Sequence, residues 1–304
     1  MPSVSSLEEA SAALAAAHSE GRRLRIGDDL AADGMTRILE HDPGDLTCTV
    51  ETGIRLSTLR TALAVAGQRL SLDPPGDPTI GALLAGNLSG PLRHRFGAPR
   101  DLVLGATLVL ADGTIASAGG KVVKNVAGYD LARLACGSEG RLAFIGRASF
   151  RLHPLPRSSR TVVVETDDAA RVVTRLLASH LQPSSLDVLH PGRVAVLFEG
   201  SERAVAAQVD TTRALVGGDE SDTAVWDESR GRQGAATGRV RFAPGELGRV
   251  LGELDEAVVR PAAGIAYVAE AASYELSQAE SDDRVDRLVE RIVREFDPRG
   301  VLAA

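Results

Sequence analysis

Hydrophobic and polar positions in the first half of the chain follow two alternating periods. Apolar residues recur every three or four positions in some stretches, which predicts helices, and alternate with polar residues in others, which predicts strands. An Ala-Asp-Gly turn between two further apolar runs predicts a β-hairpin over residues 102–117. The expected helices span residues 7–19, 57–67 (with Ser57 as N-cap) and 130–136, and the other expected strands span residues 24–26, 46–50 and 142–153.

The composition changes at a Pro- and Ser-rich segment, residues 153–159, so we predict two domains, residues 1–155 and 156–304. The second part alternates strand and helix patterns, which favours helices packed on an antiparallel sheet and an α+β fold class. Residues 217–238 are polar and poorly periodic, and predict a loop anchored by Trp226. The expected strands are 162–165, 186–189, 194–198, 240–242 and 265–268, and the expected helices are 167–180, one from Ser201, 245–254 and an amphipathic helix at 283–296.

Composition and charge exclude several classes of function. A net charge of −7 with 3% aromatic residues argues against a nucleic-acid-binding protein, which needs a basic face. No apolar run is long enough for a transmembrane helix, and the N-terminus lacks the order of a signal peptide, so we expect a cytoplasmic protein. Cys48 and Cys136 fit no metal spacing or disulfide framework, and we expect no metal site and two structural thiols.

One glycine-rich segment holds both lysines of the chain. Of the 34 Lys and Arg residues, only Lys121 and Lys124 are lysines, and both lie within residues 119–130. Lysine is a compact point charge and arginine a planar fork, so their survival in a chain that otherwise uses arginine indicates a local requirement, although chance remains the alternative. Two more segments rich in small residues, 79–90 and 137–145, are not Walker or GxGxxG motifs. Three such segments suit a long anionic cofactor, and each alone would suit a tight turn.

The order of these motifs resembles a known family. Thr79-Ile80-Gly81, Asn87-Leu88-Ser89-Gly90-Pro91, the lysine segment through Asp130, and Gly137-Ser138-Glu139-Gly140 follow one another as in the FAD-binding domain of vanillyl-alcohol oxidase/PCMH-type flavoproteins. Within that family the chain is most similar to FAD-binding subunits of bacterial glycolate oxidases. The specific motifs cover roughly residues 75–153, and a weaker likeness extends to the C-terminus.

The resemblance implies a two-lobed PCMH-type FAD-binding domain followed by a smaller α+β cap domain, whose C-terminal helix returns to the first domain. It implies FAD as cofactor, with the flavin as the redox agent. The cofactor-binding residues it indicates are Thr79, Ile80, Gly81, Asn87, Ser89 and Gly90 on the pyrophosphate and ribityl side, Lys124, Gly128, Tyr129 and Asp130 along the cleft, and Gly137, Ser138, Gly140 and Ile145 at the adenosine end.

The sequence departs from the family pattern after the first strand. A Gly-Gly-Gly-Thr-like loop is usual there, and this chain has Gly27-Asp28-Asp29-Leu30, which places two carboxylates where the pyrophosphate would lie. Like charges about 4 Å apart repel by ~1 kcal/mol in water and more in a protein. The final residues also lack the usual Asn-Pro-Gly-Arg ending. No catalytic base is identified, because a solvated loop histidine is the favoured interpretation of His94, and Arg93, Arg95 and Arg100 could bind phosphate or remain solvated.

Three functions remain open on this evidence. The leading hypothesis is an FAD-binding subunit that oxidises a small 2-hydroxy acid beside a larger flavoprotein subunit and an iron–sulfur subunit, through which it could lie peripheral to the inner membrane; this chain itself has no cysteine set for a cluster. The alternative is a degenerate flavin fold kept as a structural or regulatory subunit without catalytic FAD. A stand-alone flavin oxidase is the weakest.

Overall fold

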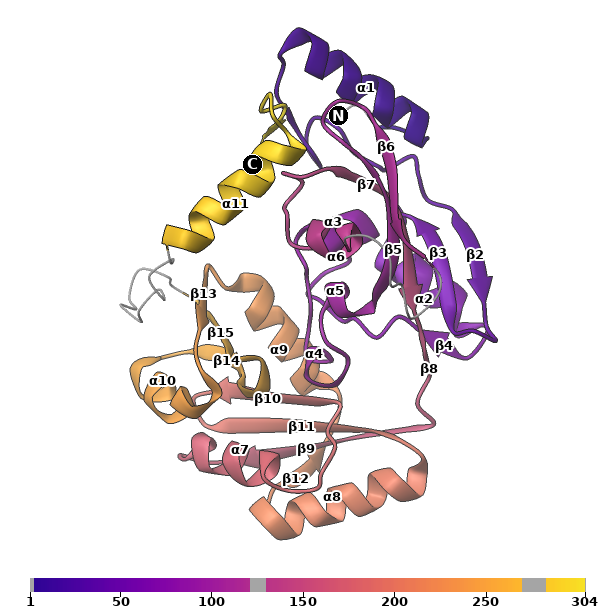
Figure 1. The fold of residues 1–304 in the computed structure, drawn as a ribbon. Helices are drawn as coiled ribbons and strands as arrows, with labels where there is room; N and C mark the ends of the chain where they lie inside the picture. Colours follow the sequence, from indigo (N-terminus) through magenta and orange to yellow (C-terminus); the bar gives the residue numbers. More distant parts are fainter. Residues whose placement is uncertain (1–2, 121–129, 270–282, 304) are drawn as a thin grey trace.

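The computed structural model describes residues 3–120, 130–269 and 283–303. Two sheets, each with helices packed against it, form the upper and lower halves of the molecule in Figure 1, and helix α11 lies to one side. The upper half contains the N-terminal helix and the segments that resemble an FAD-binding domain. Lys124, Gly128 and Tyr129 lie outside the described residues.

A five-stranded antiparallel sheet forms the centre of the upper half. Buried side chains from the sheet and from helices α2, α3 and α6 form one core cluster with Leu102 of α5. A second cluster joins α1 to β1 and to Val301 and Leu302. The strands, in sheet order, are β2 (Ile38–Asp42), β3 (Thr47–Glu51), β7 (Phe144–Arg151), β5 (Val103–Val109) and β6 (Ile115–Gly119), and the helices are α1 (Leu7–Glu20), α2 (Leu56–Ala64), α3 (Ile80–Ala85), α5 (Pro99–Leu102) and α6 (Leu131–Ala135).

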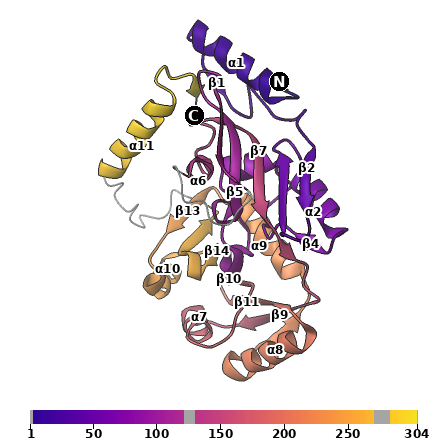
Figure 2. The same cartoon turned by 45° about the vertical axis from the view of Figure 1, so that its right-hand side comes forward.

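Two short pairs of strands complete the upper half. Strand β1 (Leu24–Arg25) pairs in parallel with β16 (Leu302–Ala303), although the two are separated by nearly the whole chain. Strand β4 (Gln68–Arg69) pairs with β8 (His153–Pro154), where the chain passes into the lower half. Figure 2 shows α1 and β1 at the far end of the molecule from the second sheet.

A seven-stranded antiparallel sheet forms the lower half, and both of its faces are covered. Alternate residues of a strand face opposite sides, so Val194 and Val196 of β11 pack with helices α7, α8 and α10, while Ala195 and Leu197 pack with Trp226 of α9. The strands, in sheet order, are β12 (Asp219–Ser221), β9 (Ser158–Glu165), β11 (Arg193–Gly200), β10 (Ser185–His190), β14 (Ala257–Arg260), β15 (Ile265–Val268) and β13 (Gly238–Arg241).

The helices of this half are α7 (Ala169–Leu177), α8 (Glu202–Val216), α9 (Ala224–Ala235) and α10 (Leu247–Glu253), with 3-10 turns at Pro244–Glu246 and Pro261–Ala263. Helix α11 (Asp283–Phe296) lies beside the upper half (Figure 1). A short helix of the first half, α4 (Arg93–Phe96), contacts β10 and the second 3-10 turn. Helices α4 and α9 therefore lie between the two sheets (Figure 1).

Several sequence predictions are confirmed and others are wrong. The hairpin β5–β6, helix α1 and helix α11 form where they were predicted. Ser57 is not an N-cap: α2 begins after Arg55, and the Ser57 hydroxyl donates to Asp77 at 2.7 Å. The predicted loop 217–238 contains β12 and α9, although Trp226 is buried as expected. Strands β2 and β14 were missed.

Candidate functional site

Two of the small-residue segments lie side by side in the upper half. The Gly137 N–H donates to the Leu84 carbonyl at 3.0 Å, and the Glu139 N–H donates to the Ala85 carbonyl at 2.9 Å. Gly140 has a φ of +80°, and a Cβ built on it would lie 2.8 Å from the Cβ of Ile26. The segments around residues 26, 84 and 140 therefore meet, as the resemblance to FAD-binding domains predicts.

The segment after α3, residues 87–90, is called here the Ser89 loop. Asn87 has a φ of +47°, and its Oδ1 accepts the Arg100 N–H at 3.3 Å. Ser89 and Gly90 are buried, yet their own N–H groups donate to no other residue in the described part of the chain. A buried N–H without an acceptor is costly, so the Ser89 loop offers two donors that a ligand can satisfy.

Gly90 occupies a position where no other residue fits. A Cβ built there would lie 1.7 Å from the Asp73 carbonyl oxygen, because the chain at Asp73 packs directly behind the loop. Glycine is the residue that permits such an approach. The Ser89 loop is thus packed directly against the backbone at Asp73.

The adenosine end predicted at residues 137–140 also offers an unused polar group. The Ser138 hydroxyl is buried and has no hydrogen-bond partner among the described residues. It lines a cavity of about 170 Å³ together with Leu142 and with Val289 and Val293 of α11. This cavity has an apolar wall and one free hydroxyl, which is the chemistry an aromatic base such as adenine requires.

Other predicted cofactor residues are already engaged by the protein. Thr79 is the N-cap of α3, and its hydroxyl accepts the Ala82 N–H at 3.2 Å. The N–H groups of Ile80 and Gly81 donate to Ile54 and Thr52. The Ile145 side chain lies in the core. These residues shape the site, but none of the groups described for them is identified as free to donate to a ligand. Asp130 is exposed and caps α6 by accepting the Arg133 N–H at 3.1 Å.

The loop after β1, residues 27–30, is called here the Gly27 loop, and it closes on itself. The Gly27 N–H donates to the Leu30 carbonyl at 2.9 Å, and the N–H groups of Asp28 and Asp29 both donate to the Arg25 carbonyl. The Asp29 carboxylate accepts the Arg25 N–H at 2.8 Å, and the Asp28 carboxylate lies 3.4 Å from the Arg25 guanidinium. As folded here, this loop cannot aim its N–H groups at a pyrophosphate.

The lower half contributes residues to the site that sequence reasoning missed. Gln233 of α9 donates to the Ser89 carbonyl at 2.8 Å, and Arg260 of β14 donates to the same oxygen at 3.4 Å. Arg260 also lies 3.5 Å from Asp187 of β10, and both side chains are almost fully buried. Ser229 donates to Asp187 at 2.5 Å. A charged residue inside the apolar run 257–260 was the available signal.

Cations gather on the lower side of the Ser89 loop. Arg93 donates to the Ser89 hydroxyl at 3.1 Å, and its pKa is lowered by burial, with Tyr267, Arg260 and Arg241 among the charged and titratable groups around it. Arg260 lies over the Tyr267 ring at 5.0 Å. In the described structure Arg93 forms no ion pair. A partly buried guanidinium without a carboxylate partner is suited to bind an anion.

The other candidate groups do not form a catalytic centre. Burial lowers the pKa of His94, and burial together with neighbouring arginines lowers the pKa of His153 to about 4. Burial raises the pKa of Cys48 and of Cys136 to about 12, which keeps both as thiols. Within the described ranges, no group of His, Cys, Asp and Glu residues could hold a metal ion.

The described residues fit FAD at two places and not at a third. The N–H groups of Ser89 and Gly90 and the hydroxyl of Ser138 are unsatisfied donors on adjoining segments. In the Gly27 loop the N–H groups of Gly27, Asp28 and Asp29 already have acceptors within the protein. FAD would therefore be held mainly by the Ser89 loop and the segment around Ser138.

Comparisons with known proteins agree with this geometry. Residues 3–119 match the model of the FAD binding domain family. The chain is 35% identical over 201 residues to glycolate oxidase subunit GlcE of Escherichia coli, covering 64% of this chain and 56% of that protein. It is 37% identical over 170 residues to glycolate oxidase subunit GlcD of Bacillus subtilis, covering 54% and 36%. The chain spans about half the length of GlcE and about a third of GlcD.

Solved structures show the same fold. An alkyldihydroxyacetonephosphate synthase superposes with a TM-score of 0.72 at 16% identity, covering 99% of this chain and 74% of that one. FAD is the cofactor that the matching domain indicates. Residues 3–119 match the FAD binding domain family, and the chain is similar to subunits of glycolate oxidase.

Proposed function

We propose that this chain is an FAD-binding subunit of a 2-hydroxy-acid dehydrogenase complex of the glycolate oxidase type. Relatives named glycolate oxidase subunits and a relative in Saccharomyces cerevisiae named D-lactate dehydrogenase [cytochrome] 1, 29% identical over 202 residues, support the substrate class. A subunit of this kind works beside a larger flavoprotein subunit and an iron–sulfur subunit, to which electrons pass. No described helix is long and apolar enough to cross a membrane.

The observation that carries the proposal is the junction at Ser89. Its N–H and that of Gly90 have no acceptor among the described residues, while its carbonyl accepts hydrogen bonds from Gln233 and Arg260 of the other half of the molecule. Two donors on a fixed backbone can bind a cofactor oxygen without reorganising. The lower half thus both positions the loop and covers it from water.

Arg93 is the residue we assign to the substrate carboxylate. It is partly buried beside Ser89 and has no carboxylate partner among the described residues, whereas the charge of Arg260 is matched by Asp187. The planar fork of arginine binds a carboxylate through two hydrogen bonds. Bound FAD would supply the acceptor for the hydride, and Arg93 would fix the hydroxy acid beside it.

The Gly27 loop supports a second candidate function. A loop in which the N–H groups of Gly27, Asp28 and Asp29 are used internally is the expected form of a flavin fold retained for structure or regulation. In that case the chain would bind its partner subunits without FAD. The unsatisfied donors of Ser89, Gly90 and Ser138 favour the first proposal.

The visible spectrum of the purified chain separates the two functions. The proposal predicts a bound-flavin spectrum, or its recovery when FAD is added to the apo-protein. With partner subunits present, glycolate or D-lactate added without oxygen should then bleach the flavin absorbance band. Arg93→Met should raise the substrate concentration needed for this bleaching by about tenfold or more. Arg239→Met, on the exposed edge strand, is the control and should leave that concentration unchanged. A colourless chain that does not bind added FAD, yet still assembles with its partner subunits, would instead establish the structural or regulatory role.

A further inference from the structure

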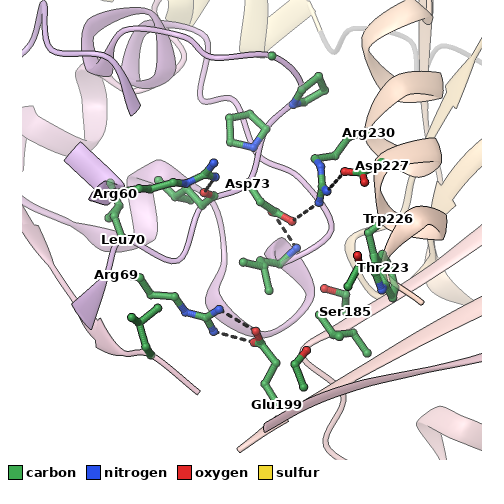
Figure 3. A pocket seen from close by; sticks show the side chains of 18 of the residues that line it. Arg60, Arg69, Leu70, Asp73, Ser185, Glu199, Thr223, Trp226, Asp227 and Arg230 are labelled. Atoms are coloured by element: carbon green, nitrogen blue, oxygen red, sulfur yellow. Dashed lines mark hydrogen bonds and ion pairs between the residues drawn. The ribbon is translucent and has the colours of Figure 1, made fainter. Parts of the chain in front are cut away.

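A cavity of about 870 Å³ lies between the two halves of the molecule, on the other side of Asp73 from the Ser89 loop. Figure 3 shows it from close by. Its walls come from α2, β4 and residues 72–76 above, and from β10, β11 and α9 below. None of the residues predicted to hold FAD lines it. Its volume is in the range of small-molecule sites, about 300–1,000 Å³.

Two of the three arginines in the cavity are neutralised by carboxylates. Arg69 and Glu199 form a bidentate ion pair, in which the two terminal guanidinium nitrogens lie 2.7 and 2.6 Å from the two carboxylate oxygens. Arg230 donates to Asp227 at 2.6 Å and lies 3.5 Å from Asp73. These pairs are drawn in Figure 3 and leave little attraction for an added ion at either place.

Arg60 is the third arginine, and it has no carboxylate partner in the described structure. One of its N–H groups donates to the Leu72 carbonyl at 2.5 Å. Burial lowers its pKa, and the charge of Asp73 has the largest opposing effect. A partly buried guanidinium paired only with a carbonyl retains donors for a carboxylate.

The floor of the cavity offers a second unsatisfied group. Ser185 of β10 is fully buried, and its hydroxyl has no hydrogen-bond partner in the part of the chain that the structure describes. The Arg69 Nε is buried without a partner as well. Buried polar groups are normally paired, so two unpaired donors on facing walls indicate that a ligand completes them.

The remaining wall is apolar. Trp226, Leu70 and Leu92 line it, and Trp226 is fixed by a hydrogen bond from its indole N–H to Thr161 at 2.9 Å. A rigid aromatic face beside one free guanidinium suits a ligand with an apolar body and one negative charge. Phosphate fits poorly, because three carboxylates, Asp73, Asp227 and Glu199, also line the cavity and would repel a dianion.

We propose that this cavity is a binding site for a small organic monocarboxylate, whose carboxylate is held by Arg60 and whose apolar body lies on Trp226. The Ser185 hydroxyl would hydrogen-bond a polar substituent of the ligand. The site is separate from the FAD site and does not depend on the function proposed above.

Trp226 makes the proposal directly testable, since it is the only tryptophan of the chain. Its fluorescence is followed while the full-length protein is titrated with glycolate, hexanoate and phenylacetate, and with phenylacetamide as the neutral counterpart. At least one carboxylate should give a saturable change with a Kd of about 1 mM or tighter. Phenylacetamide should bind at least about tenfold more weakly than phenylacetate, and inorganic phosphate should give no response, because the site requires one negative charge.

Variants of Arg60 test whether its guanidinium is the group that binds the carboxylate. Arg60→Met should weaken carboxylate binding about tenfold or more, and Arg60→Lys, which keeps charge without the fork, should fall between. Arg203→Met, on exposed α8, is the matched control and should leave the titration unchanged. Denaturant unfolding of each variant establishes that it is folded. FAD binding, followed separately through flavin fluorescence, should not change in Arg60→Lys.

Two results would overturn the proposal without any variant. Equal affinity for phenylacetate and phenylacetamide would show that the cavity has no preference for a carboxylate. A Trp226 signal that responds to none of the three carboxylates would show that none enters the cavity. Loss of FAD binding in wild type would instead contradict the function proposed above and leave this site standing.

Discussion

The Gly27 loop and the Ser89 loop each contain one glycine, and both lie near the segment 137–140, yet their backbones are used in opposite ways. In the Gly27 loop every N–H from residue 27 to 29 has an acceptor within the loop or at Arg25. In the Ser89 loop two N–H groups have none, and the carbonyl of Ser89 is held from outside by Gln233 and Arg260.

The difference shows where the open conformation is maintained. A short loop left alone satisfies its own polar groups by turning back on itself, as the Gly27 loop does. The Ser89 loop stays open because Asp73 packs behind Gly90 and because Gln233 of the lower half donates a hydrogen bond to the Ser89 carbonyl. Glycine in a sequence permits a binding loop, and tertiary contacts decide whether it becomes one.

Arg260→Met removes both a hydrogen bond to the Ser89 carbonyl and the buried ion pair with Asp187, and it should have the largest effect. It leaves Asp187 buried without its cation, which costs about 3–5 kcal/mol of folding free energy, and it should abolish retention of FAD. Chemical denaturation and flavin absorbance measure the two effects. Arg239→Met on the exposed edge strand β13 is the control and should change neither.

The double variant Arg260→Met with Asp187→Asn should recover part of that stability, because the unpaired charge is gone. Equal instability of the single and double variants would show that the buried pair is not what supports the loop.

Gly90→Ala tests the wall behind the loop. The added Cβ would overlap the Asp73 carbonyl, so the loop must move, at a cost of about 2–4 kcal/mol and with loss of FAD. Gly231→Ala, on an exposed part of α9 with open space around it, should be neutral or stabilising by about 0.5–1 kcal/mol. Wild-type flavin content in Gly90→Ala would remove Gly90 from the site.

The carboxyl group of Asp73, behind Gly90, makes the stability of the protein depend on pH. Burial raises the pKa of Asp73 to about 7, and the groups facing it are the Leu92 N–H, Arg230, Arg260 and Asp187. The unfolded chain has a carboxyl of ordinary pKa, about 3.9. Between these values the native state holds a proton that the unfolded state has released, so stability falls as pH rises through this window.

The expected loss between pH 5 and pH 7 is about 2–3 kcal/mol, and little further change above pH 7 is due to Asp73. Asp73→Asn should remove this part of the pH dependence while keeping an acceptor for Leu92. Denaturant titrations of both proteins across the window measure the difference. Parallel curves would mean that Asp73 stays ionised in the native state.

Asp28→Gly with Asp29→Gly should have the smallest effect. The Asp28 side chain is 65% exposed and both carboxylates interact with Arg25, so their repulsion of a cofactor phosphate is weak and screened. Affinity for FAD should change by less than about 1 kcal/mol, and the change should shrink with salt. A gain of a hundredfold would show that the Gly27 loop opens when FAD binds.

Local pattern was sufficient to predict much of the fold. Helix α11 and the hairpin β5–β6 follow from periodicity and a turn motif. Helix α9 was missed because its sequence is polar and holds Gly231 and Gly234; its stability comes from burying Val225 and Trp226 against the second sheet. Strand β14 was missed because all four of its residues are buried and show no alternation.

The site was predicted only in its upper half. The adjacency of residues 84–90 and 137–140 follows from the family resemblance and agrees with the structure. Asp187, Gln233 and Arg260 come from three separate elements, and only the three-dimensional arrangement brings them to Ser89. The closure of the Gly27 loop likewise depends on backbone hydrogen bonds that no side-chain pattern encodes.

The pairing of β1 with β16 has a consequence for synthesis. Val301 and Leu302 fill the cluster formed by α1 and Leu24, so the N-terminal layer lacks part of its core until residues 301–303 have left the ribosome. Contacts of such long sequence separation form late and slowly. During translation, exposed apolar surface near the N-terminus is therefore a natural binding place for chaperones, and it disappears when residues 301–303 dock.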